Sequence, residues 1–194
     1  MKFIPSIWVL YVFFLTGFLF PHAIQATTNS GIDTLQIQLA PLTKEKVRDY
    51  IKTSVAITQL QNKMKANASQ YENLIKTFYQ KRKELLESRG WTVKGFEETQ
   101  TRVFATKNAI REEARLKSEE EFKKEIAEIN ASPYFTEEQK SGIIEVEQSL
   151  RRHALEEIIQ PTKPDWPAVK AYQKELEHLS DYAASNRADP PVLE

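Results

Sequence analysis

The sequence predicts an all-α protein, an irregular bundle of about five helices that follows an N-terminal signal peptide. The composition supports this class, because the 194-residue chain has no Cys, only 5 Gly and 28% charged residues, and low Gly with abundant Lys, Glu and Leu is typical of helical proteins. After residue 42, apolar residues recur three and four positions apart, which is the spacing of one helix face. Gly, Pro and capping residues separate these segments and predict where each helix begins and ends.

Residues 1–26 have the order of a secretory signal peptide. Lys2 is the only charge, an apolar run fills residues 3–20, and the segment closes on the small residue Ala26. This order predicts cleavage after Ala26 and export to the periplasm. The alternative is an uncleaved inner-membrane anchor, because a run of 18 residues could just cross a bilayer.

The rest of the chain divides into a flexible leader, a helical domain and a flexible tail. We expect the polar leader at residues 27–41, the domain at 42–182 and the tail at 183–194. A domain of this length can bury a core. Because the chain has no Cys, its stability must come from helix packing rather than from disulfides.

Local signals predict the first two helices. Thr43 is a suitable N-cap, because its hydroxyl can accept a free backbone N–H, and an apolar stripe follows it to a break expected within residues 62–69. The second helix is predicted to end at Gly90, since Gly can adopt the left-handed conformation that closes a helix.

The third helix is predicted to be unusually long. Thr92 caps it, and its apolar residues continue to about Asn130. Its middle is polar on most sides and contains Glu and Lys four residues apart, such as Glu119 and Lys123, an arrangement worth about 0.2–0.5 kcal/mol. We therefore expect a solvated or bent helix there.

A capping box and prolines bound the last two helices. Thr136 and Gln139 have the capping-box spacing, in which each side chain accepts a backbone N–H. Pro161 and Pro164 predict the end of the fourth helix, and Asp165 is the expected cap of the fifth. The fifth helix carries an apolar stripe that is predicted to face inward, formed by Val169, Tyr172, Leu176 and Leu179.

Charge is distributed unevenly although the net charge is +0. Residues 43–90 contain 11 Lys and Arg against 5 Asp and Glu, whereas residues 91–194 contain 15 against 21. Either the two halves pack together and compensate, or two copies pair antiparallel as a homodimer. The neutral balance and the predicted export argue against nucleic acid as a partner.

The sequence offers no catalytic constellation. Neighbouring carboxylates such as Glu137 and Glu138 point about 100° apart on a helix and do not converge on one bond. Gly residues are too few for a phosphate-binding loop. His153 and Glu157 could supply two metal ligands on one helix face, but a catalytic zinc site needs three. We therefore predict a non-enzymatic protein without catalytic, cofactor-binding or metal-binding residues.

Three aromatic residues are the candidates for partner binding. Tyr134, Phe135 and Trp166 lie beside helix ends near Pro. Most large apolar residues at helical spacing belong to a core, whereas an exposed cluster would indicate a surface for a protein partner or an unfolded client. Both interpretations stay open from the sequence.

One motif resembles a chaperone signature. Phe135-Thr136-x-x-Gln139 resembles the L-T-x-x-Q motif of periplasmic chaperones of the Spy and CpxP type, with Phe135 in place of Leu. The motif covers only the start of the fourth predicted helix. It adds a chaperone-like role to the expectations, beside its local role as a helix start.

A wider pattern resembles an uncharacterised family of small exported all-helical proteins of Gram-negative bacteria. Its parts span nearly the whole chain after the predicted signal peptide. They are Leu42-Thr43 with Val47, Tyr50 and Ile51, then Gly90-Trp91-Thr92 with Phe96, then Phe135 to Lys140, and finally the stripe from Val169 to Leu179. The resemblance implies a shared fold and no specific activity.

Two functions are therefore expected. The first is an exported, non-enzymatic protein that captures unfolded clients on an apolar helical surface, with membrane contact only through the signal peptide during export. The alternative is a structural or assembly subunit that acts through homo- or hetero-oligomerisation.

Overall fold

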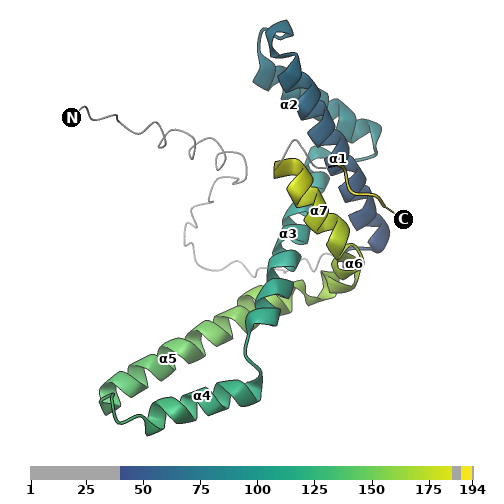
Figure 1. Ribbon diagram of the computed structural model, residues 1–194. Coiled ribbons are helices and arrows are strands. Elements are labelled where there is room, and N and C mark those ends of the chain that lie inside the picture. Colours follow the sequence, from purple (N-terminus) through teal and green to yellow (C-terminus); the bar gives the residue numbers. More distant parts are fainter. Residues whose placement is uncertain (1–39, 185–188, 194) are drawn as a thin grey trace, which may run out of the picture. The chain divides into compact units, whose positions relative to one another are not determined.

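The structure is a computed structural model that describes residues 40–184 and 189–193, and its regular structure there is helical without strands (Figure 1). The all-α fold class is therefore confirmed. The predicted signal peptide and nearly all of the leader lie outside the described residues. The α-helices are α1 (Lys44–Ala66), α2 (Leu74–Ser88), α3 (Val93–Arg115), α4 (Glu119–Ala131), α5 (Glu137–His153), the short α6 (Trp166–Lys170) and α7 (Gln173–Ala184). Within this part of the chain, no helix combines the length and apolarity needed to span a membrane.

The predicted start and end of α1 and the predicted end of α2 are confirmed. The Thr43 hydroxyl accepts a hydrogen bond from the Lys46 backbone N–H at 3.1 Å, and α1 ends at Ala66, inside the expected break. Gly90 has a φ of 76°, and the Trp91 N–H donates to the Leu86 carbonyl at 2.9 Å. This left-handed closure ends α2 and turns Trp91 into the core.

The prediction of one long third helix is wrong. The chain leaves helical geometry at Leu116, which has φ −65° and ψ 130°, and a separate helix α4 begins after Ser118. Ser118 and Glu121 form a capping box: the Ser118 N–H donates to the Glu121 carboxylate at 2.8 Å, and the Glu121 N–H donates to the Ser118 hydroxyl at 3.2 Å. These bonds stabilise a new helix start where the apolar stripe was weakest.

The prolines also act differently from the prediction. The α-helix α5 ends at His153, but the chain stays helical through a π turn (Ala154–Ile159) and a 3₁₀ segment (Gln160–Asp165) into α6. Pro161 lies in the first turn of the 3₁₀ segment, where its missing N–H is not needed. In this stretch, the Thr162 hydroxyl donates a hydrogen bond to the Ile159 carbonyl at 2.9 Å.

The main core forms where α1, α3, α6 and α7 meet, with the end of α2 and the Gly90 turn beside them. The expected inward stripe of the last helix is confirmed, although Tyr172 is only half-buried. Full burial stabilises by about 1.5–3 kcal/mol for each large aliphatic or aromatic side chain. The buried members are Leu42, Val47, Tyr50, Ile51, Leu86, Trp91, Phe96, Val103, Ala168, Val169, Leu176 and Leu179.

Helices α4 and α5 form an antiparallel hairpin (Figure 1). The two helices contact each other, and α5 runs on into the π turn, which packs against α3. Neither α4 nor α5 contains a fully buried residue. The hairpin therefore adds surface to the fold and little core.

Two observations concern the predicted tail. Ala183 and Ala184 belong to α7. Further along, Leu193 is partly buried and packs against the main core, so this part of the chain end contacts the domain.

Candidate functional site

The three candidate residues for partner binding lie in two different environments. Tyr134 is 89% exposed and Phe135 is 43% exposed at the turn between α4 and α5, whereas Trp166 is only 6% exposed. Trp166 packs with Ala109 and Ile159 in a second, smaller core cluster. The structure thus brings Tyr134 and Phe135 together and places Trp166 elsewhere.

Contacts on several sides hold the Trp166 ring in that cluster. The indole N–H donates to the Thr162 hydroxyl at 3.0 Å. The ammonium groups of Lys163 and Lys170 lie 4.1 Å and 4.4 Å from the ring centroid, a distance at which a cation is attracted to an aromatic face. These contacts account for Trp166 as a structural residue.

The aromatic tip, formed by Tyr134 and Phe135, directly precedes the start of α5. The predicted capping box is confirmed: the Thr136 N–H donates to the Gln139 side chain at 2.9 Å, and the Gln139 N–H donates to the Thr136 hydroxyl at 3.3 Å. An apolar residue at the fourth helical position would cover Phe135. That position holds Lys140, which pairs with Glu137 at 2.7 Å, so the sequence leaves the Phe135 ring without this cover.

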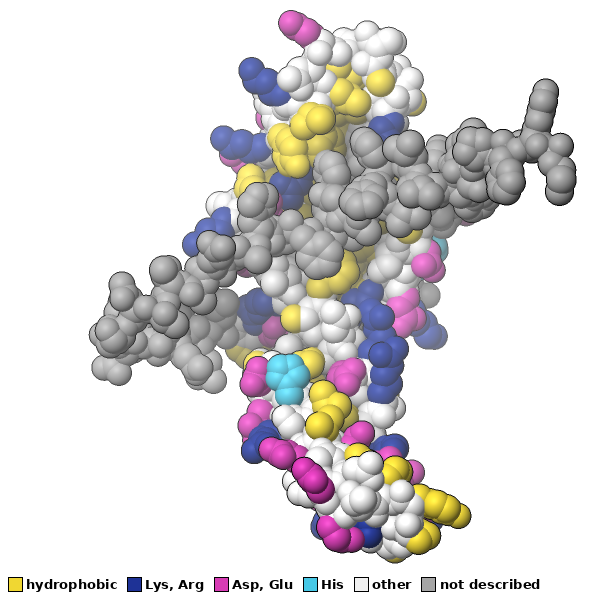
Figure 2. All heavy atoms as spheres, turned by 90° about the vertical axis from the view of Figure 1, so that its left-hand side faces the viewer, with side chains coloured by type: hydrophobic (Ala, Val, Ile, Leu, Met, Phe, Trp, Pro, Cys, Tyr) yellow, Lys and Arg dark blue, Asp and Glu magenta, His cyan; other side chains and the backbone are white. Residues whose placement is uncertain are grey.

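A second apolar surface runs along α5. Val146 is 57% exposed and Leu150 is 59% exposed, and because they are four residues apart they lie on one side of the helix. Glu145 and Glu147 are the neighbours of Val146 on either side. Each points about 100° away from Val146 around the helix, so the two carboxylates flank the apolar strip on opposite sides. We call Val146, Leu150 and these two flanking carboxylates the α5 face. On the side seen in Figure 2, Asp and Glu side chains and hydrophobic side chains are interspersed over the hairpin.

Arg151 ties the open end of the hairpin together. Its guanidinium donates to the Lys117 carbonyl at 2.8 Å, pairs with Glu119 at 3.1 Å and lies 4.7 Å from the centroid of the Phe122 ring. Nearby, a hydrogen bond from Lys117 to Glu125 raises the pKa of the lysine. Polar contacts at the surface therefore hold α5 against the start of α4, in place of a buried core.

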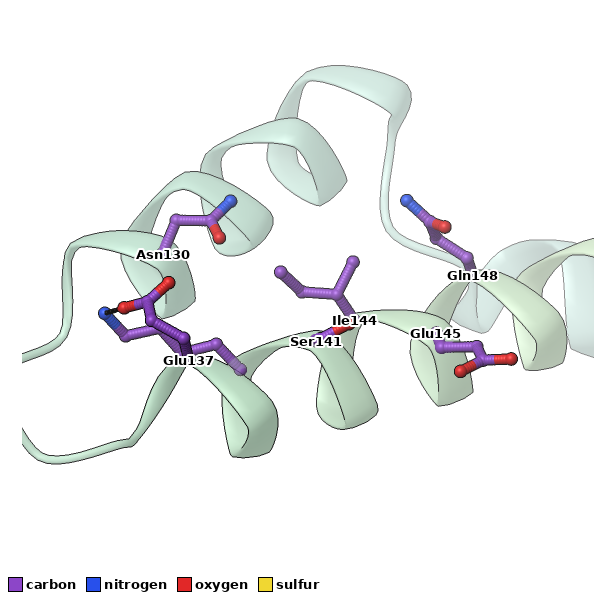
Figure 3. Close-up of a pocket in the computed structure, with 7 residues that line it drawn as sticks. Asn130, Glu137, Ser141, Ile144, Glu145 and Gln148 are labelled. Atoms are coloured by element: carbon purple, nitrogen blue, oxygen red, sulfur yellow. Dashed lines mark hydrogen bonds and ion pairs between the residues drawn. The ribbon is translucent and has the colours of Figure 1, made fainter.

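A hollow of about 400 Å³ lies between the end of α4 and the first half of α5 (Figure 3). Ile144 points into it between Asn130 and Gln148. The lining is otherwise polar and offers donors and acceptors suited to the main chain of a peptide rather than to an apolar side chain. It consists of Asn130, Glu137, Lys140, Ser141, Ile144, Glu145 and Gln148.

The buried carboxylate of Asp165 joins three parts of the fold. Asp165 is buried and accepts hydrogen bonds from the Leu42 N–H at 2.8 Å and from Arg102 at 2.9 Å and 2.6 Å. Arg102 also donates to the Ala40 carbonyl at 2.9 Å. The expectation that Asp165 caps the last helix is wrong, because its backbone is helical and its side chain makes no capping bond. Both carboxylate oxygens are used to join chain segments, so the group is structural.

The half-buried amine of Lys107 is also engaged within the fold. It donates to the Leu176 carbonyl at 3.0 Å and to the Ser180 hydroxyl at 3.1 Å. Burial lowers the pKa of this amine, with the charge of Arg111 as a smaller cause. The contacts fasten α3 to α7.

The predicted pair of His153 and Glu157 is formed on the surface. The His153 Nδ1 lies 3.1 Å from a Glu157 carboxylate oxygen, and both side chains are more than half exposed. Over the described ranges, no group of three or more His, Asp and Glu side chains is placed to hold a metal ion.

Comparison of the chain with protein-family models, with curated protein sequences and with solved structures finds no match. The resemblance to exported helical proteins and to the chaperone motif therefore stays a prediction.

Proposed function

We propose that the protein is an exported, non-enzymatic protein that captures apolar segments of other polypeptide chains at the tip of its α4–α5 hairpin. The exposure of Tyr134 at 89% beside the partly exposed Phe135 is the observation that carries this proposal. A pair of exposed aromatic residues offers large contact area at low entropic cost, because each side chain has only two rotatable bonds.

The surroundings of the aromatic tip on the hairpin also support the capture of clients. The tip adjoins the polar hollow, in which Asn130, Ser141 and Gln148 can exchange hydrogen bonds with a client main chain. An apolar side chain of the client would contact the tip while its main chain occupies the hollow. Although each aromatic ring is large, two rings and a hollow make a small contact by the standard of stable protein interfaces, so binding would be weak and reversible, which suits transient protection of unfolded chains.

An aggregation-suppression assay tests this function. Residues 27–194 are mixed with an unfolded model protein whose light scattering is followed over time. We expect the wild type to reduce scattering and the double variant Tyr134→Ser with Phe135→Ser to lose that effect. The matched control, Tyr71→Ser, changes a half-buried aromatic residue that lies outside the hairpin. Equal suppression by the tip variant and the wild type would refute the role of the tip.

A further inference from the structure

Opposite charges lie at two separate places along α3. Residues 60–90, which include α2, contain seven Lys and Arg against three Asp and Glu, whereas residues 118–153, the hairpin, contain five against nine. Helix α2 contacts the start of α3, where Arg82 pairs with Glu97 at 3.2 Å, and the hairpin follows the end of α3 at Arg115.

The charges of these two regions are too far apart to neutralise each other within one molecule. From Phe96 to Arg115 the helix rises by about 28 Å, which exceeds the screening length of about 8 Å in physiological salt. Helix α2 also does not pack against the hairpin, because its contacts are mainly with α1 and α3. Its positive charges therefore do not neutralise the acidic hairpin by direct contact.

Helix α2 carries a surface that complements the α5 face. Ile75 and Tyr79 are four residues apart and more than half exposed. Lys76 and Lys83 lie beside them on the same side of the helix, since they are three and four residues from Tyr79. Lys83 is paired only with the exposed Glu87 at 3.8 Å, a contact worth little in water. We call Ile75, Lys76, Tyr79 and Lys83 the α2 face.

The two faces are alike in their apolar residues and opposite in charge. Each presents two large apolar side chains one turn apart on a helix; two lysines border the strip on α2, and Glu145 and Glu147 flank the strip on α5. Each helix is weakly buried in its own fold: Leu86 is the only buried residue of α2, and α5 has none. An apolar strip flanked by basic residues fits an apolar strip flanked by acidic residues.

We propose that the α2 face of one molecule binds the α5 face of a second copy. The contact is reciprocal in an antiparallel pair, because each molecule then offers its α2 face to the other's α5 face. Two such contacts close a dimer with two-fold symmetry. This pairing deepens the proposed function, as it names a partner for the hairpin. It leaves Tyr134 and Phe135 free for clients, while Glu145 belongs both to the α5 face and to the lining of the hollow.

A charge-swap experiment tests the pairing. One variant carries Lys76→Glu and Lys83→Glu, so both its faces are acidic; another carries Glu145→Lys and Glu147→Lys, so both its faces are basic. Each variant of residues 27–194 is studied by analytical ultracentrifugation, alone and as an equal mixture. Circular dichroism checks folding, and Lys52→Glu with Lys174→Glu, exposed lysines outside both faces, is the matched control.

The wild type and the control are expected to form dimers whose stability falls as salt is raised. Each variant alone is expected to dimerise at least about tenfold more weakly, a loss of about 1.4 kcal/mol. The equal mixture is expected to regain dimers, because both contacts in the mixed pair are again complementary. A monomeric wild type, unchanged dimers in the variants, or a mixture that stays monomeric would each overturn the pairing.

The outcome is separable from that of the client assay. The variant of Tyr134 and Phe135 tests capture at the tip and is expected to dimerise like the wild type. Loss of client suppression with intact dimers would support both proposals, whereas dimers without any suppression by the wild type would refute the proposed function alone.

Discussion

The core helices and the α4–α5 hairpin use similar apolar patterns for opposite purposes. In the core, Val47 and Ile51 on α1 are fully buried, whereas Val146 and Leu150 on α5 are more than half exposed. Both pairs are four residues apart on a helix. The comparison shows that helical spacing of apolar residues predicts a helix but does not tell whether its stripe meets another part of the same chain.

The core helices and the hairpin also differ in the interactions that stabilise them. The core is stabilised by burial and by the Asp165–Arg102 contact, while the hairpin relies on two capping boxes and surface pairs such as Arg151 with Glu119. Elements with few buried contacts open locally at low free energy. A hairpin built this way can adapt to a partner without loss of the fold.

Substitution of core and hairpin isoleucines should give the largest contrast. Ile51→Ala removes a fully buried side chain and is expected to lower the free energy of unfolding by about 2–5 kcal/mol. Ile144→Ala, in the half-buried hairpin interior, is expected to cost about 1 kcal/mol. Urea denaturation followed by circular dichroism measures both. Equal losses would contradict the division into core and hairpin.

Loss of the Asp165 contact should have the next largest effect on the free energy of unfolding. Asp165→Ala leaves Arg102 and the Leu42 N–H without their acceptor, and the expected cost is about 3 kcal/mol, since breaking a largely buried charge pair from one side leaves an uncompensated charge. The control Asp49→Ala removes an exposed carboxylate of α1 and should change stability by less than about 0.5 kcal/mol. A loss for Asp165→Ala as small as that of the control would show that the contact contributes nothing.

The start of α4 should show a smaller and local effect. Ser118→Ala removes the hydroxyl that accepts the Glu121 N–H and is expected to cost about 1 kcal/mol. Hydrogen exchange read by mass spectrometry should become faster in α4 and stay unchanged in α1. Faster exchange throughout the chain would mean that α4 belongs to the cooperative core.

The smallest effect is a pH dependence confined to the same cap. Hydrogen bonds from the Ser118 backbone and hydroxyl lower the pKa of Glu121. A carboxylate with a lowered folded pKa stabilises above its unfolded value of about 4.3, and the contribution is lost as pH falls through the lower folded value. Amide protection in the first turn of α4, taken relative to the intrinsic exchange rate at each pH, should therefore fall in acid, and Glu121→Gln should remove that step. Retention of the step in Glu121→Gln would assign it to another group.

Local signals in the sequence predicted the fold class and the starts of α1, α3 and α5, three of the seven α-helices in the described part of the chain. Thr43, Gly90 and Thr136 act as expected, because caps and left-handed closures depend on a few neighbouring residues. The break before α4 was also encoded locally, in Ser118 and Glu121, but the pattern of apolar residues and ion pairs favoured a continuous helix.

Long-range features could not be predicted in the same way. Asp165 meets Arg102 across 63 residues and Leu42 across 123, and no spacing in the sequence indicates such contacts. The candidate site was predicted in part: Tyr134 and Phe135 are exposed together, while Trp166 is buried with Ala109 and Ile159. The α2 and α5 faces were not singled out, because Ile75 and Val146 have the same spacing as core residues.

Hydrogen exchange of residues 27–194 with and without an unfolded model protein tests most directly whether the hairpin is a binding surface. The structure predicts that the client slows exchange around the tip, from the end of α4 through the first turns of α5, and leaves α1 and α3 unchanged. Slower exchange in α1 and α3 with no change in the hairpin would contradict this account.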